Sequence, residues 1–283
     1  MTSLLAGVIG WPVSHSLSPS MHRFWLQENG IDGSYEALPV CRHDLSRVLD
    51  SLQHTGFVGV NLTLPHKEAG YAIAHTADPT AHTTGAANLL LLRGLRLEAY
   101  NTDVEGLLLS LRDTLGKSAT GIERAVVLGA GGAARAAVLA CDRIGTRQIC
   151  ILNRTKGRAD ALVRAMTESV EATLTAIDPE TWAAVAPQTR LLINATSSGL
   201  GGSASPDVSL ECLPGDAAVC DLVYNPLETP LLARARARGL LVIDGLGMLM
   251  HQGALAFELL FAKRPTVSAA LRAHLEQALP NGT

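Results

Sequence analysis

Short apolar runs alternate with longer stretches of helical periodicity along most of this chain. The alternation predicts βαβ units, in which helices cover the faces of a mainly parallel sheet, and therefore an α/β fold. The apolar runs predict strands near residues 5–10, 34–39, 57–62, 88–92, 97–100, 125–129, 148–152, 191–195, 218–222 and 240–243. The periodic stretches predict helices near residues 18–29, 43–54, 66–75, 104–115, 132–144, 155–166, 230–238, 249–262 and 266–278.

A glycine-rich turn separates the strand predicted at 125–129 from the helix predicted at 132–144. Gly129, Gly131 and Ala134 have the G-x-G-x-x-G/A spacing of dinucleotide-binding turns. In such turns the first glycine allows the tight turn, the second lets the backbone approach a pyrophosphate, and the helix N-terminus attracts its charge. The turn therefore predicts a bound dinucleotide. The alternative is a turn that only lets the helix pack closely on its strand.

The position of this turn predicts two α/β domains. A C-terminal Rossmann-like domain over residues 104–245 leaves residues 1–103 for substrate chemistry. We place the second crossing between the domains at Gly245-Leu246-Gly247, where two glycines interrupt the pattern. The helices predicted after it are too little for a domain of their own, so we expect residues 246–283 to complete the N-terminal substrate domain.

Composition favours a small-molecule ligand over a macromolecular partner. With 283 residues, 47% of them hydrophobic, the chain can form two buried cores. A net charge of −3, with basic and acidic residues interspersed, predicts binding neither to nucleic acid nor to an anionic membrane. No apolar run approaches the ~20 residues that span a bilayer, and the N-terminal residues lack the basic region of a signal peptide.

The cysteines and histidines predict neither disulfides nor a metal site. The five cysteines, widely spaced and without a C-x-x-C pair, are typical of reduced thiols in a cytoplasmic protein. His15, His22 and His66 lack the spacing of metal ligands, so we expect no metal cofactor. A homodimer is the oligomer that we consider, although no motif specifies it.

The segment after the next strand favours NADP over NAD. NAD-specific folds usually place an acidic residue there to bind the ribose hydroxyls, but this chain has Asn153-Arg154-Thr155-Lys156-Gly157-Arg158. A carboxylate would repel a 2′-phosphate, whereas the guanidinium groups of Arg154 and Arg158 can bind it through paired donors. The alternative, two solvated basic residues at the start of a helix, is weakened because cations are disfavoured near a helix N-terminus.

Before the nucleotide fold, polar residues recur at the ends of the predicted strands. Each cluster has a plain structural alternative: Ser16 or Ser18 could cap a helix, and Asp103 could cap the helix that follows it. Hydroxyl groups at a helix start also suit a substrate carboxylate. The recurrence is the stronger signal, and it indicates a candidate substrate site made of Ser16, Ser18, Thr63, Lys67, Asn88 and Asp103.

Lys67 and Asp103 are the candidate acid–base pair. Taken alone, Lys67 would be a solvated residue at a helix start. Beside a carboxylate that keeps it oriented and charged, a lysine ammonium can pass a proton to or from an alcohol next to the cofactor. An ammonium can also stabilise the charge that develops on a carbonyl oxygen, so this chemistry needs no metal.

In these motifs the chain resembles the shikimate dehydrogenases over nearly its whole length. Several separated motifs in the right order are far more specific than any one of them. The motifs are Ser16-Leu17-Ser18-Pro19, Asn61-Leu62-Thr63-Leu64-Pro65-His66-Lys67, Asn101-Thr102-Asp103, Gly129-Ala130-Gly131-Gly132-Ala133, Asn153-Arg154-Thr155 and Gly245-Leu246-Gly247-Met248-Leu249.

The resemblance implies reversible reduction of 3-dehydroshikimate to shikimate with NADPH, a step of chorismate and aromatic amino-acid biosynthesis. It implies that Lys67 is the catalytic acid and base, with Asp103 as its partner. It implies a substrate site that comprises Ser16, Ser18, Thr63, Lys67, Asn88, Asp103, Tyr224 and Gln252, in which the two serines and Tyr224 hold the carboxylate. It implies a cofactor site that comprises Gly129, Ala130, Gly131, Gly132, Ala133, Asn153, Arg154, Thr155, Arg158, Leu222 and Gly245.

Three positions depart from the pattern of the family that the chain resembles. Leu89 stands where threonine is usual, Val104 stands where glycine is common, and Ala77-Asp78-Pro79-Thr80 replaces a more acidic helical stretch. None of these departures removes a polar group named above. Val104 could change the flexibility of the hinge between the domains.

Two alternatives stay open. One is a quinate or quinate/shikimate dehydrogenase, whose substrate differs by one ring hydroxyl. Ser18, where quinate-preferring relatives often have threonine, and Arg154, where NAD users tend to be acidic, favour shikimate and NADP. The other is a catalytically silent ligand-binding relative, against which the intact Lys67 and Asp103 argue.

Overall fold

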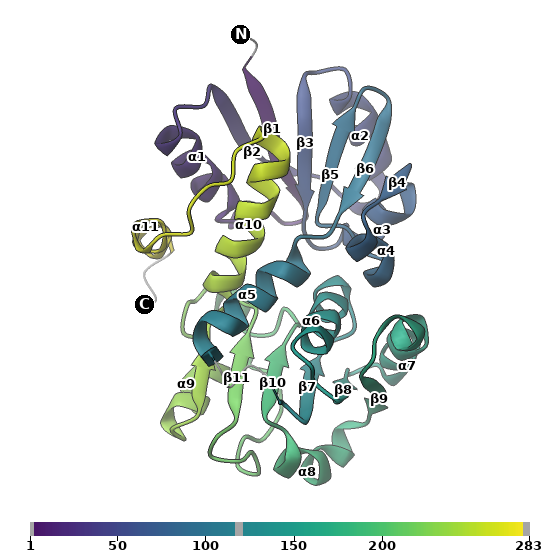
Figure 1. Cartoon of the computed structure of the whole chain (residues 1–283), viewed down its shortest axis with the longest axis vertical. Helices are drawn as coiled ribbons and strands as arrows, with labels where there is room; N and C mark the ends of the chain where they lie inside the picture. The colour runs from purple at the N-terminus through teal and green to yellow at the C-terminus, as the bar shows by residue number, and fades with distance from the viewer. Residues whose placement is uncertain (1–2, 117–120, 280–283) are drawn as a thin grey trace. The chain divides into compact units, whose positions relative to one another are not determined.

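Two separate six-stranded sheets organise the chain, each within its own compact unit (Figure 1). The computed structural model describes residues 3–116 and 121–279. The first unit joins the residues up to Asp103 to Leu249–Ala278, and the second is made chiefly of Val104–Met248. Residues 1–2 and 280–283, at the ends of the expected first domain, lie outside the described residues. The predicted α/β class with two sheets is confirmed.

The register of the first sheet brings three strand ends to one edge. Strand β1 pairs in parallel with β2 and β3, whereas β5 pairs antiparallel with both β3 and β6. Asn61 lies opposite Leu89, which lies opposite Tyr100. The residues that follow β3, precede β5 and follow β6 therefore meet. In the order β2-β1-β3-β5-β6-β4, the strands are β1 (Leu4–Gly10), β2 (Gly33–Pro39), β3 (Phe57–Leu62), β4 (Thr76–Ala77), β5 (Leu89–Arg93) and β6 (Arg96–Tyr100).

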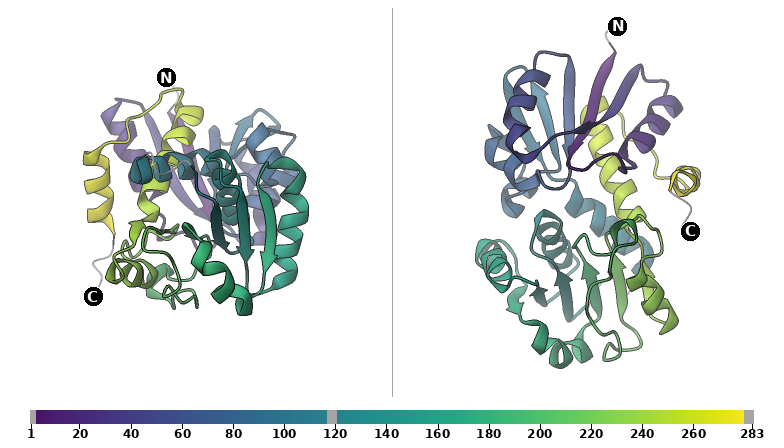
Figure 2. Two further views of the ribbon diagram at one scale, coloured as in Figure 1. Left: turned by 60° about the horizontal axis from the view of Figure 1, so that its bottom comes forward. Right: turned by 180° about the vertical axis from the view of Figure 1, so that it is seen from behind.

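Helices cover both faces of this sheet. On one face, buried residues of α2 such as Leu45 and Leu49 pack against Val60 and Leu90 of the sheet. On the other face lie α1 and α10, as Figure 1 and the right-hand view of Figure 2 show. The helices assigned to this unit, in whole or in part, are α1 (Ser18–Glu28), α2 (Leu45–Leu52), α3 (Lys67–Ile73), α4 (Pro79–Thr84), α10 (Gly245–Phe261) and α11 (Ala269–Ala278).

The C-terminal segment of the chain is tied to α1 by polar and aromatic contacts. The indole nitrogen of Trp25 donates to the Thr266 carbonyl at 3.1 Å, and Ser20 Oγ lies 2.9 Å from His274 Nε2. The Phe257 ring lies 5.6 Å from that of Trp25. Residues from opposite ends of the chain thus share one core.

His22 lies in the middle of this aromatic core. Its ring is 1% exposed and stacks on Tyr35 with the ring centroids 3.9 Å apart. Burial lowers the pKa of the His22 imidazole from its ordinary 6.5 to about 3. The histidine is therefore neutral in the folded protein at every pH at which the fold is expected to function.

The buried histidine is expected to make the protein less stable in mild acid. Below pH 6.5 the unfolded chain protonates His22 but the folded chain does not until about pH 3, so stability is full above 6.5 and falls as the pH drops through this window. The slope is about 1.4 kcal/mol per pH unit. Urea unfolding at about pH 7 and about pH 5 should show about 2 kcal/mol less acid destabilisation in His22→Phe than in the wild type. The exposed His54→Asn is the matched control for the loss of a histidine. An unaltered pH dependence in His22→Phe would contradict the prediction.

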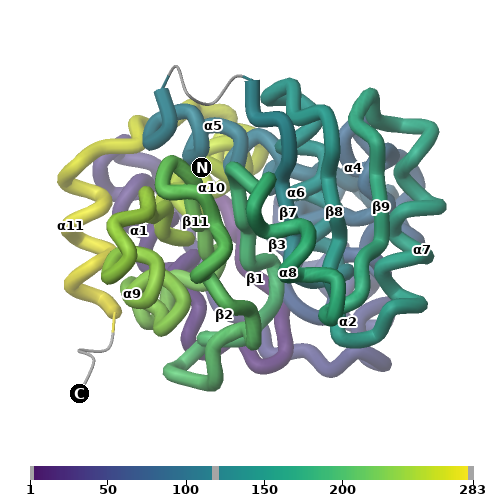
Figure 3. The backbone as a smooth tube through the Cα atoms, turned by 90° about the horizontal axis from the view of Figure 1, so that it is seen from below, coloured from purple at the N-terminus to yellow at the C-terminus, as the bar shows by residue number. Residues whose placement is uncertain are grey.

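The second sheet is parallel throughout and has the strand order of dinucleotide-binding folds. Counted within this unit, its strands run 3-2-1-4-5-6 across the sheet. Figure 3 shows β7, β8 and β9 side by side, with α7 beyond them. In the order β9-β8-β7-β10-β11-β12, the strands are β9 (Thr173–Ile177), β8 (Gln148–Leu152), β7 (Arg124–Leu128), β10 (Leu191–Asn194), β11 (Ala218–Asp221) and β12 (Leu241–Ile243).

Side chains alternate between the two faces of this sheet and so build two cores. Ala125 and Val127 point to the core formed with α5, α6 and α7, and Val126 and Leu128 point to the core formed with α8 and α9. The near-continuous apolar composition of the strands follows from burial on both faces. The helices are α5 (Asp103–Leu115), α6 (Gly132–Arg143), α7 (Lys156–Met166), α8 (Trp182–Val185) and α9 (Pro230–Ala237).

The elements that the sequence pattern missed are short. Neither the edge strands β4 and β9 nor the helices α4 and α8 were predicted. Residues in β9 alternate between exposed and buried, which is the period-two pattern of a strand, but the pattern covers only five residues. Asp78 caps α4 by accepting from the Ala81 amide at 2.8 Å, with a proline directly after it, which is a helix-start signal.

The start of α10 corrects one prediction. The helix begins at Gly245, four residues before the predicted residue 249, so the two glycines lie within its first turn and do not interrupt it. A Cβ at Gly245 would come within 2.5 Å of the Leu222 carbonyl oxygen, and one at Gly247 within 2.6 Å of Ser110 Oγ. Close packing explains the glycines at these two positions.

Candidate active site

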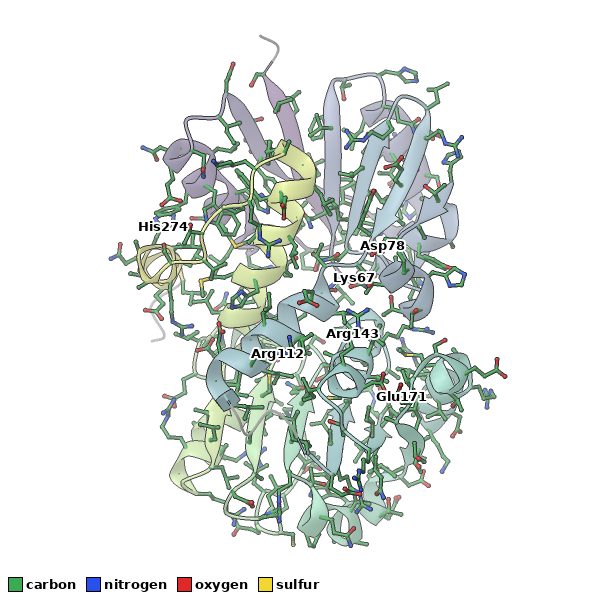
Figure 4. The ribbon with its side chains drawn as sticks, in the orientation of Figure 1. Lys67, Asp78, Arg112, Arg143, Glu171 and His274 are labelled. Atoms are coloured by element: carbon green, nitrogen blue, oxygen red, sulfur yellow. The ribbon has the colours of Figure 1, made fainter. Side chains whose placement is uncertain are left out.

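Lys67 and Asp103 form an ion pair at the edge of the first sheet where the three strand ends meet. Lys67, labelled in Figure 4, is the first residue of α3, which follows β3. Asp103 follows β6. Lys67 Nζ lies 2.5 Å from Asp103 Oδ2. The lysine side chain is 19% exposed and the aspartate side chain 5%. The ammonium group therefore remains accessible to a ligand while the carboxylate is largely enclosed.

Asn88 connects this pair to α10. Its Nδ2 lies 3.0 Å from Asp103 Oδ1, 3.0 Å from Gln252 Oε1 and 2.8 Å from Thr102 Oγ1. Its Oδ1 accepts from the Thr102 amide at 2.8 Å. Asn88, Thr102, Asp103 and Gln252 are all buried. The structure thus unites four of the predicted substrate-site residues, namely Lys67, Asn88, Asp103 and Gln252, in one hydrogen-bonded cluster.

Asn101 holds the segment that carries Asp103. Its Oδ1 accepts from the Asp103 amide at 3.0 Å, and its Nδ2 donates to Thr84 Oγ1 at 3.0 Å and to the Ala86 carbonyl at 2.9 Å. Asp78 Oδ1 accepts from the Asn101 amide at 3.1 Å. Sequence reasoning left out Thr102 and gave Asn101 no role. Their position beside Asp103 in the Asn101-Thr102-Asp103 motif was the signal that could have identified them as site residues.

A second buried chain of hydrogen bonds reaches Asn88 from β2. The Tyr35 hydroxyl donates to Asn61 Oδ1 at 2.8 Å, and Asn61 Nδ2 donates to the Asn88 carbonyl at 3.0 Å. Tyr35 and Asn61 lie on strands that are not neighbours in the sheet, so no local pattern could have paired them. This chain fixes the backbone that carries the Asn88 side chain.

The remaining substrate-site residues of the first unit lie outside this hydrogen-bonded cluster. Ser18 begins α1 and its amide donates to Ser16 Oγ at 3.3 Å. The amide of Thr63, just after β3, donates to the Ile9 carbonyl at 2.9 Å. This contact stabilises the turn before α1, whose N-cap is Leu17 and which has no side-chain cap, so neither serine caps the helix. The hydroxyls of Ser16 and Ser18 remain candidates for binding a carboxylate.

The glycine-rich turn lies at the switch point of the second sheet, between the carboxyl ends of β7 and β10. Gly129 has a φ of +109°, which side-chain-bearing residues rarely adopt. A Cβ there would lie 3.1 Å from the Ala195 carbonyl oxygen. At Gly131, apart from the glycine and its neighbours along the chain, no described atom lies within 4 Å of such a Cβ. The turn therefore leaves room beside α6 for a pyrophosphate to approach the backbone.

Substitutions at these two glycines are expected to have different effects. Gly129→Ala should destabilise the protein by about 1–3 kcal/mol because of the positive φ and the close carbonyl. Gly131→Ala should leave the free energy of unfolding nearly unchanged, since its methyl group enters open space, but should weaken NADPH binding. Urea unfolding and fluorescence titration with NADPH measure the two effects. Unchanged NADPH affinity in Gly131→Ala would show that the pyrophosphate does not bind beside Gly131.

The three cations after β8 differ in their partners. Lys156 is paired with Asp178 at 2.6 Å, and this hydrogen bond raises the pKa of the lysine. Arg154 and Arg158 are exposed, and within residues 3–116 and 121–279 their side chains have no ion pair. Asn153 Nδ2 donates to the Thr155 carbonyl at 2.8 Å, which stabilises the turn. The two guanidinium groups are therefore available for an external anion.

The other predicted ligands of the second unit follow β11 and β12. Leu222 comes directly after β11, and Gly245 packs on it at the start of α10. Tyr224 is half-buried in the same segment. In the described part of the chain, no three His, Cys, Asp or Glu side chains are grouped to hold a metal ion. No described helix is both long and apolar enough to cross a membrane.

Comparison with known proteins decides the family. Residues 8–90 match the family model for the shikimate dehydrogenase substrate binding domain. The chain is 44% identical to the NADP(+) shikimate dehydrogenase of Rhodopseudomonas palustris strain BisB18, over 99% of each chain. The chain belongs to the shikimate dehydrogenase family. The resemblance stated from the motifs is thereby confirmed.

Solved structures of the shikimate dehydrogenase family and its relatives have the same fold. The shikimate 5-dehydrogenase of Thermus thermophilus, in complex with NADP(H) and shikimate, is 41% identical with a TM-score of 0.84, over 98% of this chain and 100% of that one. A quinate dehydrogenase of Corynebacterium glutamicum in complex with NAD is 29% identical with a TM-score of 0.88, over 97% and 99%. The fold alone therefore does not distinguish between the two substrates.

Proposed function

We propose that this protein catalyses the NADP-dependent, reversible reduction of 3-dehydroshikimate to shikimate, a step of chorismate and aromatic amino-acid biosynthesis. The observation that carries the proposal is the accessible Lys67 ammonium on the buried Asp103 carboxylate, in a member of the shikimate dehydrogenase family. Residues 1–103 with 246–283 would form the substrate domain and residues 104–245 the cofactor domain.

In this proposal Lys67 is the catalytic acid and base. In the reductive direction its Nζ donates a proton to the substrate oxygen that becomes the hydroxyl, and in the oxidative direction it accepts that proton. Asp103 keeps the ammonium oriented through the 2.5 Å contact. Because Asn88 binds the other carboxylate oxygen, the aspartate cannot rotate away from the lysine without losing a buried hydrogen bond.

The same proposal assigns the remaining polar groups to substrate binding. Thr63, Asn88 and Gln252 would contact ring hydroxyls, and Ser16, Ser18 and Tyr224 would bind the carboxylate. The enclosure of Asn88 and Gln252 supports their role, because buried amides that are already oriented lose little entropy on binding.

The second unit would hold NADP through its turn and its two available guanidinium groups. When bound, NADPH supplies the hydride that the carbonyl carbon receives. Gly129, Ala130, Gly131, Gly132 and Ala133 would bind the pyrophosphate at the α6 N-terminus. Asn153, Arg154, Thr155 and Arg158 would bind the adenosine phosphate, and Leu222 and Gly245 would line the nicotinamide.

One steady-state comparison tests this function against its alternatives. The purified protein is assayed for oxidation of shikimate and of quinate, each with NADP and with NAD. We expect kcat/KM to be highest for shikimate with NADP. A preference for quinate or for NAD would favour the quinate/shikimate alternative. No activity with any of the four pairs would favour the alternative of a catalytically silent ligand-binding relative.

Location and assembly are the remaining parts of the proposal. We propose a cytoplasmic protein, which the five unpaired cysteines support because disulfides are rare in the reducing cytoplasm. A homodimer stays a prediction. Sedimentation velocity at micromolar concentration would decide it, and a single monomer mass would exclude the dimer.

A further inference from the structure

The carboxyl ends of β10 and β11 contain a buried carboxylate that no step above uses. Asp221 is the last residue of β11 and is 0% exposed, as are Asn194 at the end of β10 and Thr229 before α9. No lysine, arginine or histidine among the described residues pairs with Asp221. A buried carboxylate without a counter-charge is costly unless several donors satisfy it.

Three donors from different segments converge on Asp221. Its Oδ1 accepts from Asn194 Nδ2 at 2.8 Å and from the Val223 amide at 3.1 Å, and its Oδ2 accepts from the Thr229 hydroxyl at 2.7 Å. Burial raises the pKa of the Asp221 carboxyl, and these hydrogen bonds oppose that shift. An ionised carboxylate is acceptor-only, so it can bind all three donors at once, whereas an asparagine offers a single acceptor oxygen.

Asn194 extends the network into the loop after β10. Its Oδ1 accepts from the Thr196 amide at 3.1 Å and from the Thr196 hydroxyl at 2.7 Å, and its Nδ2 donates to the Ser198 carbonyl at 3.1 Å. The loops 195–198 and 222–229 are thus connected through a single carboxylate.

Each of these loops touches one of the glycines assigned to the cofactor. A Cβ at Gly129 would meet the Ala195 carbonyl oxygen and Thr196 Cγ2, both at 3.1 Å. A Cβ at Gly245 would meet the Leu222 and Val223 carbonyl oxygens at 2.5 and 2.8 Å. In parallel sheets of this strand order, ligands bind beyond the carboxyl ends of the strands near the switch point.

We propose that Asp221 is a positioning residue for the cofactor: with Asn194 and Thr229 it holds the loops 195–198 and 222–229 in the arrangement that NADPH binds. This inference rests on the proposed function, because it takes the dinucleotide site of the second unit as given. Asp221 itself is too enclosed to touch the ligand and acts through the loops.

The test compares threonine substitutions at the two ends of the second sheet. Thr229→Val keeps the shape but deprives Asp221 of its hydroxyl donor and the Leu232 amide at the start of α9 of its acceptor, and Thr229→Ser restores both contacts. Thr189→Val is the matched control, since Thr189 is also 0% exposed but lies before β10, and its hydroxyl donates to the Val185 carbonyl. Each purified full-length variant is titrated with NADPH by fluorescence, and its Tm is recorded.

We expect Thr229→Val to raise the Kd for NADPH about tenfold, because a charge-assisted hydrogen bond that orders the loops is lost. Thr229→Ser should stay within about twofold of the wild type, and Thr189→Val should lower the Tm without changing the Kd. Asp221→Asn should raise the Kd as Thr229→Val does, and it decides the matter if Thr229→Val does not fold.

Two results would overturn the inference. One is a lowered Tm with an unchanged Kd in Thr229→Val and Asp221→Asn, which would make the network merely structural. The other is an equal rise of Kd in Thr189→Val, which would make the effect one of general destabilisation. A wild-type protein that does not bind NADPH would instead refute the proposed function, so the two failures are distinguishable.

Discussion

Replacing Lys67 with alanine is expected to lower kcat by about 10²–10⁴-fold, the usual contribution of a positioned general acid or base. The effect on shikimate binding should be far smaller, because the interaction of the ammonium with the substrate oxygen strengthens as charge develops in the transition state. Lys67 is the only group in the ion pair with appreciable exposure, so Asp103 is poorly placed to take over the proton transfer.

The measurement is steady-state kinetics of shikimate oxidation together with the Kd for shikimate by calorimetry. Lys263→Ala, which removes an exposed lysine of the first unit, is the matched control and should leave both values unchanged. Equal losses in kcat and in binding would count against Lys67 as acid and base, since they would indicate uniform binding of substrate and transition state.

Replacing Arg154 with alanine is expected to raise the Kd for NADPH by about 10–100-fold while the Kd for NADH changes little. The estimate follows from losing about 1.5–3 kcal/mol of charged hydrogen bonding to the 2′-phosphate, which NADH lacks. Arg154 is exposed and has no ion pair within the described residues, so no internal carboxylate competes for its guanidinium group.

Fluorescence titration with both cofactors measures this selectivity. Arg164→Ala, in the last turn of α7, is the control for a general loss of positive charge and should leave both affinities unchanged. Lys156→Ala should have a smaller effect than Arg154→Ala, because Lys156 is already paired with Asp178. Equal weakening of NADPH and NADH binding in Arg154→Ala would place the guanidinium group away from the 2′-phosphate.

Sequence pattern located the strands more closely than the helix ends, since α10 begins four residues before its predicted start at 249. Every predicted strand begins and ends within one residue of an observed one, because most of these strands are apolar runs between polar turns. The misses were elements too short for a period to show, such as β4, or glycines whose role is close packing, such as Gly245. The sequence alone does not distinguish a glycine that allows a turn from one that allows a close contact.

The candidate site also has features that the sequence determined and features that only the tertiary structure decided. The sequence by itself determined that Lys67, Asn88 and Asp103 stand at strand ends and that Arg154 and Arg158 replace an acidic residue after β8. Only the tertiary structure decided that Tyr35 orients Asn61, that Asn101 connects Thr84 to Asp103, and that Asp221 joins two loops. Composition and period act over a few neighbouring residues, whereas partners such as Asn194 and Asp221 lie 27 positions apart and meet only through strand order and register.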